Sequence, residues 1–231
     1  MFLTAKDVAK MIDLSCVRTT SNKADIVEMV NTARRYGFGQ VSVLQCFILY
    51  TKELLKDAPG VRVVGNVSFP SGSDSTSFKV LQAKEMLATG CDEIDMVMNI
   101  GKLRSGEFEE VESDVRAVVE IVHPTPIKVI IEIMSLTPEE TKKACDICLR
   151  TGATFVKTGT GWADRATTLE DVNLVKSIVG DRIKIKASGG IRDLDMLVKM
   201  YKAGAGRFGV NLKSGINIVE ECMSLGAGIE V

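Results

Sequence analysis

The sequence predicts an α/β fold, a (β/α)8 TIM barrel formed by residues 1–231 as a single domain. Short β-rich runs alternate with amphipathic helical segments, eight of each, along the chain. No linker or low-complexity tract divides the sequence, and its 231 residues suit one barrel. An open, doubly wound sheet is the alternative. The G-x-G-x-x-G motif that such sheets carry after an early strand is missing, which favours the barrel.

The strands are predicted from short runs rich in β-branched and aliphatic residues. In chain order they cover residues 10–13, 40–44, 62–67, 93–98, 127–133, 153–157, 183–187 and 206–210. Because a helical segment separates each strand from the next, we expect the strands to pair in parallel.

The helices are predicted from amphipathic patterns, and an additional N-terminal helix precedes the first strand. They cover residues 4–11, 24–36, 47–56, 77–89, 108–122, 138–151, 169–179, 193–203 and 212–224. The segment TPEE at 137–140 is a helix start, with a capping threonine, a proline and two acids in the first turn. Gly90, Gly152 and Gly204 each follow a predicted helix, where a left-handed closing residue is favoured.

The overall charge and the N-terminal segment exclude several classes of protein. The chain is 45% hydrophobic and 26% charged with a net charge of −1, so we expect no nucleic-acid partner and no anionic membrane surface. Lys6 and Asp7 stand where a signal peptide would carry its apolar centre, and no apolar run is long enough to span a bilayer. We therefore expect a cytoplasmic protein.

The histidine and cysteine content argues against a metal site. His123 is the only histidine, so neither a Ser-His-Asp triad nor a multi-histidine metal site is expected. Cys145 and Cys148 form the only close pair among six cysteines, and they fall in a predicted helix without a second pair. We interpret them as structural and predict no metal and no cofactor.

Charged residues interrupt strands that should be apolar, because a parallel barrel strand is packed on both faces. These residues are Glu93 and Asp95, Lys128 and Glu132, Lys157, and Lys184 and Lys186. Since alternate residues share a face, Asp95, Glu132, Lys157 and Lys186 can point inward near the C-terminal ends of their strands. Barrel enzymes carry their catalytic groups at that end.

Two interpretations of these buried charges are open. They can form an interior ion-pair network that only fills the barrel, and for Lys128 and Glu132 this reading is as good as a functional one. Two lysines converging from neighbouring strands stabilise a core poorly, because like charges repel. A neighbouring cation and burial both favour the neutral amine, which attacks a carbonyl to form a Schiff base. We therefore predict that Lys157 and Lys186 together provide a nucleophilic amine, and that Asp95 handles protons directly or through a water.

Glycine-rich loops follow the last three strands, as the segments GTG at 159–161 and SGG at 188–190, and Gly209. Loops at this position in such barrels commonly bind phosphate through backbone N–H groups and a helix N-terminus. With Arg192 nearby, they predict an anion site at the same rim.

These motifs together resemble the deoxyribose-phosphate aldolase (DeoC) family of class I, Schiff-base aldolases. The resemblance runs from MIDLS at 11–15 to RFGV at 207–210. It is carried by DEIDMVMNIG at 92–101, KVIIEI at 128–133, FVKTGTG at 155–161 and IKASGGIRD at 185–193, with the variant NVSFPSG at 66–72. The resemblance implies a metal-independent lyase that cleaves 2-deoxy-D-ribose 5-phosphate reversibly to glyceraldehyde 3-phosphate and acetaldehyde.

Carried over residue by residue, the resemblance makes Lys157 the Schiff-base lysine, Lys186 the lysine that lowers its pKa and Asp95 the residue that assists proton transfer through a water. For the substrate and its phosphate we predict contacts from Asp13, Ser15, Thr160, Gly161, Gly189, Gly190, Arg192 and Gly209. We expect copies of the chain as partners, in a homodimer or homotetramer.

The sequence also departs from the family pattern. Gly159 stands for the usual serine, and Asn211 and Leu212 replace a serine pair that normally helps to hold the phosphate. Lys213 or Arg165 would then supply the replacement charge. Two alternatives follow: a related lysine-dependent aldolase that acts on another sugar or sugar phosphate, and a non-catalytic barrel that only binds a sugar phosphate.

Overall fold

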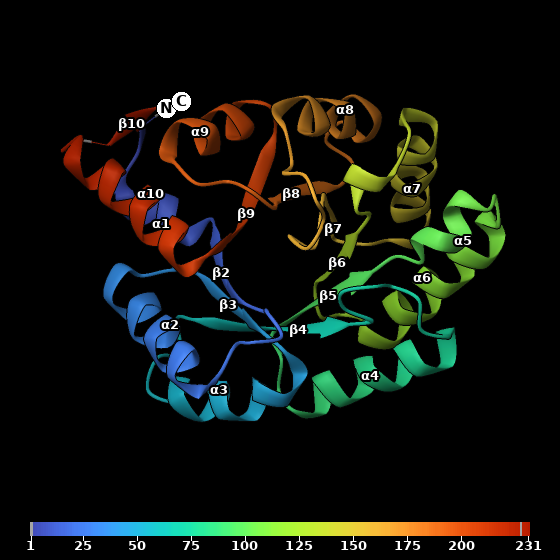
Figure 1. Cartoon of the computed structure of the whole chain (residues 1–231), viewed down its shortest axis with the longest axis horizontal. Coiled ribbons are helices and arrows are strands. Elements are labelled where there is room, and N and C mark those ends of the chain that lie inside the picture. The colour runs from blue at the N-terminus through green and yellow to red at the C-terminus, as the bar shows by residue number, and fades with distance from the viewer. Residues whose placement is uncertain (1, 227) are drawn as a thin grey trace.

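The computed structural model describes residues 2–226 and 228–231, and within them eight parallel strands form a closed barrel. The strands pair in chain order, and the first pairs with the last (Figure 1). They are β2 (Ile12–Cys16), β3 (Gln40–Val43), β4 (Arg62–Val67), β5 (Glu93–Val97), β6 (Ile127–Ile130), β7 (Phe155–Lys157), β8 (Lys184–Ser188) and β9 (Ala205–Asn211). The predicted TIM barrel is confirmed.

Helices surround the barrel, and their caps explain where several of them begin and end (Figure 1). Thr137 and Glu140 form a reciprocal capping box at the start of α7, with Pro138 in the first turn. Gly152 ends that helix at φ 78°, in the left-handed region. The outer helices are α2 (Lys23–Tyr36), α3 (Ile48–Leu55), α4 (Thr76–Ala88), α6 (Phe108–Val122), α7 (Pro138–Thr151), α8 (Leu169–Val179), α9 (Leu194–Lys202) and α10 (Leu212–Ser224).

Several short elements accompany the barrel. The predicted N-terminal helix is α1 (Ala5–Lys10), which packs against α10. Lys10 therefore belongs to a helix and not, as predicted, to the first strand. Three further elements were not predicted from the sequence: α5 (Ile100–Arg104), the 3-10 turn η1 (Gln45–Phe47), and the antiparallel pair of β1 (Phe2–Leu3) with β10 (Ile229–Glu230).

The predicted strand at 127–133 is three residues too long. It ends at Ile130, and Glu132 adopts a left-handed backbone conformation at φ 45° before the 3-10 turn η2 (Ile133–Ser135). The carboxylate of Glu132 accepts a hydrogen bond from the backbone N–H of Thr160, 3.1 Å away. This contact outside the strand ladder offsets the cost of the unusual conformation.

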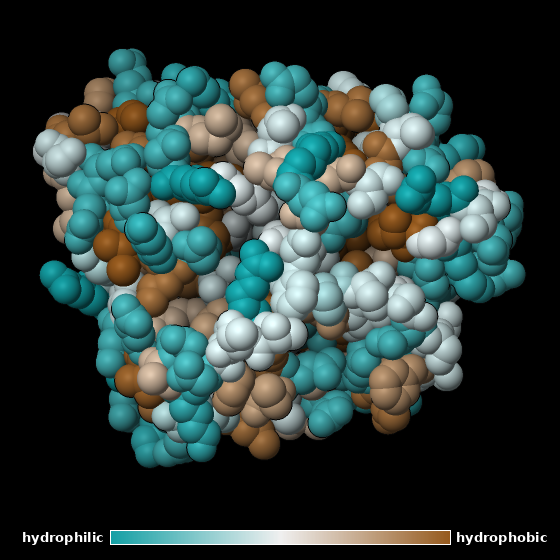
Figure 2. Space-filling model, in the orientation of Figure 1, coloured by the Kyte–Doolittle hydropathy of each residue, from teal (hydrophilic) through white to brown (hydrophobic). Residues whose placement is uncertain are grey.

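The apolar core lies between the strands and the helices, whereas the barrel interior carries buried charges. On the face shown in Figure 2, hydrophilic side chains cover the outer helices, and residues of intermediate hydropathy gather over the centre of the barrel. No helix in the described part of the chain is long and apolar enough to cross a membrane.

Candidate active site

A cluster of buried charges fills the inside of the barrel, from Glu93 at the start of β5 to Lys157 at the end of β7. The strand register places Lys157 of β7 beside Lys186 of β8, and Asp95 of β5 beside Lys128 of β6. The ion cluster consists of Asp13, Glu93, Asp95, Lys128, Lys157 and Lys186, all of them buried. The sequence predicted that Asp95, Lys157 and Lys186 meet, and they do.

Asp95 is the centre of the ion cluster and is fully buried. Its Oδ2 accepts hydrogen bonds from Lys157 Nζ at 2.7 Å and Lys186 Nζ at 3.2 Å, and its Oδ1 accepts one from Lys128 Nζ at 3.0 Å. Burial opposes ionisation, but the three ammonium groups outweigh it and hold the pKa of Asp95 well below 3.8. Asp95 is therefore a carboxylate across the physiological pH range.

The amine of Lys157 is easier to deprotonate than that of an ordinary lysine. Burial lowers its pKa from 10.5 to about 8; the charge of Asp95 opposes this shift, and the charges of Lys186 and Lys128 add to it. Burial is thus a larger cause than the neighbouring Lys186 that the sequence analysis emphasised. Among the described residues, Asp95 is the only hydrogen-bond partner of the Lys157 amine.

Lys128 has the opposite character. It forms an ion pair with Glu93 and with Asp95, and Asp13 lies 4.0 Å away. Burial alone would lower its pKa, but these three carboxylates outweigh burial and raise it. Lys128 is therefore a compensated ammonium, which matches the ion-pair interpretation for this residue.

Glu132 does not join the ion cluster, so the expectation that it points inward with Asp95 is wrong. Its carboxylate accepts hydrogen bonds from the backbone N–H and the hydroxyl of Thr160. The same hydroxyl accepts one from the backbone N–H of Trp162 at 3.0 Å. Glu132 thereby fixes the loop that follows Lys157. The hydroxyl of Thr160 already donates its proton to Glu132, so it has none left to donate to a ligand.

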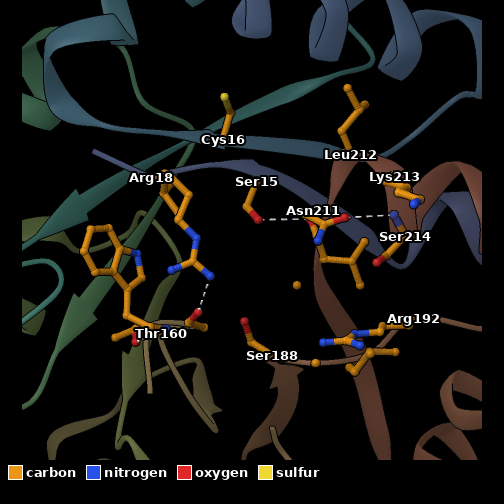
Figure 3. A pocket seen from close by; sticks show the side chains of 18 of the residues that line it. Ser15, Cys16, Arg18, Thr160, Ser188, Arg192, Asn211, Leu212, Lys213 and Ser214 are labelled. Atoms are coloured by element: carbon orange, nitrogen blue, oxygen red, sulfur yellow. Dashed lines mark hydrogen bonds between the residues drawn. The ribbon is translucent and has the colours of Figure 1, made fainter. Parts of the chain in front are cut away.

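A cavity of about 590 Å³ opens at the C-terminal ends of β2, β7, β8 and β9 (Figure 3). Lys186 and Asp13 precede Ser188 and Ser15 by two residues on the same strand faces, so the ion cluster lies beneath the cavity floor. Asp13 is the one predicted binding residue that does not line the cavity. The others that line it are Ser15, Thr160, Gly161, Gly189, Gly190, Arg192 and Gly209.

Two glycines allow close approaches at this site. A Cβ on Gly209 would lie 2.5 Å from Ser188 Oγ and 3.3 Å from Lys186 Cε. A Cβ on Gly159 would lie 2.6 Å from Met134 Cε and 2.9 Å from a Glu132 oxygen. Met134 therefore occupies the space that the family's usual serine would need at position 159, and Gly159 does not line the cavity.

The cationic side chains around the cavity differ in their partners. Arg165 is held by Asp171 through two contacts, at 2.6 and 3.1 Å, so it is a poor replacement for the missing serine pair. Within the described residues, Arg192 and Lys213 have no carboxylate at ion-pair distance. Asn211, at the first serine position, caps α10 by accepting the Ser214 N–H at 2.8 Å.

Sequence reasoning missed Arg18, which lines the same cavity from the loop after β2 (Figure 3). Arg18 lies outside any helix or strand, so no periodic pattern in the sequence indicates which way its side chain points. The available signal was its place in the loop after the first barrel strand, since such loops lie at the end of the barrel that carries the site.

Cys145 and Cys148 lie in α7 and are buried, and burial raises the pKa of both thiols. This disfavours the thiolate form that metal binding or redox chemistry requires. Among the residues that the structure describes, no group of three histidine, cysteine or carboxylate side chains could hold a metal ion.

The fold and the site define a class of protein: a barrel lyase of the aldolase type, with a low-pKa lysine beneath a polar cavity. Comparison with known proteins gives the particular family. The chain belongs to the DeoC/LacD family of aldolases, whose family model matches residues 8–219.

The chain is similar over most of its length to proteins of known name. It is 41% identical to deoxyribose-phosphate aldolase of Rhizobium meliloti, covering 98% of this chain and 91% of that one. It is 42% identical to the protein of the same name from Staphylococcus epidermidis strain RP62A, covering 92% and 95%.

Two solved structures share the fold. A structure described as QR15, an aldolase, matches with a TM-score of 0.88 and 38% identity, covering 94% of this chain and 96% of that one. Deoxyribose-phosphate aldolase from Aeropyrum pernix, described as a unique tetramer, matches with a TM-score of 0.87 and 26% identity, covering 96% and 93%.

Proposed function

We propose that this chain cleaves 2-deoxy-D-ribose 5-phosphate reversibly to D-glyceraldehyde 3-phosphate and acetaldehyde through a Schiff base on Lys157. The observation that carries the proposal is the buried amine of Lys157, with a pKa of about 8 and Asp95 at 2.7 Å. The names of its relatives support this choice of substrate.

The reaction begins with the neutral amine of Lys157, which attacks the C1 aldehyde of the open-chain sugar. The carbinolamine loses water to give an iminium ion on Nζ. At pH 7 about a tenth of an amine with a pKa of about 8 is unprotonated, whereas less than about a thousandth of an ordinary lysine is. Burial of Lys157 therefore supplies the nucleophile.

Bond cleavage then removes the proton of the C3 hydroxyl and breaks the C2–C3 bond, whose electrons move into the enamine on Lys157. Glyceraldehyde 3-phosphate leaves. The enamine takes up a proton at C2, and water hydrolyses the resulting iminium ion to release acetaldehyde and the free amine.

In this scheme Asp95 is the orienting carboxylate. Because its pKa is well below 3.8, it is a weak base and does not hold the transferred proton for long. It instead aligns the Lys157 amine and a water molecule that carries the proton. Lys186 lowers the pKa of Lys157 and keeps Asp95 ionised.

The phosphate, in this proposal, binds at the end of the cavity formed by Gly189, Gly190 and Arg192, next to the N-terminus of α10. Backbone N–H groups and the positive end of the helix dipole favour an anion there. Lys213 in the first turn of α10 adds a charge that compensates for the missing serine pair.

The direct test is reduction with borohydride in the presence of acetaldehyde, followed by peptide mass mapping. We expect an ethyl group on Lys157 and none on Lys79, a buried lysine outside the cavity that serves as the internal control. An enzyme that turns over with Lys157 unmodified would refute the mechanism.

A second candidate substrate follows from Asn211, whose side chain is used as a helix cap where the family has a serine. In this alternative the same lysine chemistry acts on another sugar or sugar phosphate. Faster turnover of a different aldol in a substrate panel, with the same adduct on Lys157, would select it over 2-deoxy-D-ribose 5-phosphate.

A further inference from the structure

Arg18 stands out among the side chains that line the cavity, because it is exposed and yet held in place. Its Nη2 donates a hydrogen bond to the carbonyl oxygen of Gly161 at 2.9 Å. Its guanidinium also lies over the ring of Trp162, 5.4 Å from the ring centroid. Figure 3 shows the guanidinium pointing into the cavity from the β2 side.

Trp162, whose ring Arg18 stacks on, is itself in contact with Phe69. Its ring meets Phe69 edge to face, with 6.2 Å between the centroids and an interplanar angle of 87°. Arg18, Trp162 and Phe69 thus join the loops after β2, β7 and β4. Arg18 is already fixed by its neighbours. Binding a ligand therefore costs less side-chain entropy than it would for an arginine that moves freely.

The guanidinium still has donors to offer. Of its five N–H donors, one is used by Gly161. Asp25 and Glu28 line the same cavity, but within the described residues no carboxylate lies at ion-pair distance from Arg18. Arg192 enters the cavity from the opposite side in Figure 3, and it too has no such partner there.

We propose that Arg18 is a specificity residue that binds the anionic phosphate group of the substrate, from the side of the cavity opposite Arg192. This inference rests on the proposed function for the choice of a phosphorylated aldol. Two guanidinium groups that face one space can each offer paired N–H donors to phosphate oxygens, which a single lysine cannot do. Trp162 supports this role by orienting Arg18.

The test compares a phosphorylated substrate with its unphosphorylated counterpart. For Arg18→Met we expect the KM for 2-deoxy-D-ribose 5-phosphate to rise about tenfold or more, because a charge-assisted hydrogen bond to phosphate is lost. The kinetic constants for 2-deoxy-D-ribose should stay within about twofold, since that sugar offers no phosphate. Trp162→Leu should raise the KM for 2-deoxy-D-ribose 5-phosphate by a smaller factor and should likewise leave the constants for 2-deoxy-D-ribose nearly unchanged.

Arg35→Met is the matched control. Arg35 is also exposed and stacked on an aromatic ring, at 5.2 Å from the centroid of Tyr36, but it lies on α2 outside this cavity. This variant removes the same charge, and the kinetic constants for both sugars should stay as they are in the wild type. Equal effects of Arg18→Met on the two sugars, or equal effects of Arg18→Met and Arg35→Met, would overturn the proposal.

Binding of glycerol 3-phosphate by calorimetry separates this proposal from the proposed function, because this phosphomonoester has no carbonyl and forms no Schiff base. Weaker binding by about tenfold in Arg18→Met supports the role of Arg18 even if the wild type neither cleaves the sugar nor traps acetaldehyde. Unchanged binding overturns that role, while an acetaldehyde adduct on Lys157 would still support the aldolase.

Discussion

Lys157 and Lys79 are both buried lysines paired with a carboxylate, but their surroundings differ. Lys79, on α4, donates to Asp114 Oδ2 at 2.6 Å and to the carbonyl oxygen of Val97 at 3.1 Å. Asp114 serves Lys79 alone among the cations, whereas Asp95 is shared by Lys157, Lys186 and Lys128 within the described residues. Burial lowers the pKa of both lysines, and for both the paired acid opposes the shift.

The difference teaches that burial and pairing alone do not make a reactive amine. Lys79 has an acid of its own and a second acceptor, and it lies between outer helices, so it is satisfied as an ammonium. Lys157 competes with two other cations for one carboxylate, and it lies beneath a cavity. The ratio of cations to acceptors and the access from solvent distinguish Lys157, the proposed nucleophile, from the ion pair of Lys79 and Asp114.

The largest expected effect is that of Lys157→Met. It should lower kcat by at least about a thousandfold, because the remaining lysines of the ion cluster, Lys186 and Lys128, stay paired with carboxylates. The free energy of unfolding should stay equal or rise, since Asp95 keeps Lys186 and Lys128 as partners. Steady-state kinetics and urea unfolding measure the two quantities. A variant that unfolds more easily than the wild type would contradict this account of Lys157.

Lys79→Met should give the reverse result. It leaves Asp114 buried without a cation, which costs about 3 to 5 kcal/mol in the free energy of unfolding. The kcat of the folded enzyme should not change. Urea unfolding checks the cost, and the double variant Lys79→Met/Asp114→Leu should recover most of it. Loss of turnover in a folded Lys79→Met enzyme would break the comparison.

The dependence of kcat/KM on pH tests how the neighbouring cations and carboxylates set the pKa of Lys157. Because the pKa of Lys157 is lowered to about 8, kcat/KM should fall as the pH decreases below about 8, where the amine becomes protonated. Lys186→Met removes a charge that lowers this pKa, so the acid limb should move to higher pH, by up to about one unit. Lys184→Met, an exposed lysine on the same strand, is the control and should leave the limb in place.

The smallest expected effect is that of Gly159→Ser, which restores the family's usual residue. The new Cβ would contact the flexible end of Met134 and the hydrogen-bonded carboxylate of Glu132, so we expect a loss of about 1 kcal/mol in the free energy of unfolding. Met134→Ala should relieve it. The acid limb should stay where it is, because these contacts do not involve the amine. A displaced limb would show that the loop, and not the ion cluster, sets the pKa of Lys157.

Much of the fold and the centre of the site could be predicted, because strand periodicity determines which way a side chain faces. It correctly brought Asp95, Lys157 and Lys186 together. Periodicity does not determine depth, however: Lys184 shares the phase of Lys186 but lies at the other end of β8, where it is exposed. It also fails where the backbone leaves the strand, as Glu132 does at φ 45°.

The remaining features depend on contacts that are distant in sequence. Arg18 reaches Gly161 and Trp162 from a loop without periodicity, and β1 pairs with β10 across nearly the whole chain. Nothing local in the sequence records such contacts, since each depends on the closed barrel that brings the partners together.

The placement of the ion cluster has a consequence for folding. Lys186 on β8 binds Asp13 on β2, and the barrel closes through the pairing of β2 with β9. Before closure, Lys157 is an ordinary solvated lysine with its charge intact, because its burial does not yet exist. We therefore expect a nascent chain to react with aldehydes no faster than ordinary lysines do, and the Lys157 amine to gain its reactivity when the first and last barrel strands meet. Trapping Lys157 with acetaldehyde and borohydride at successive times during refolding would show when the barrel closes.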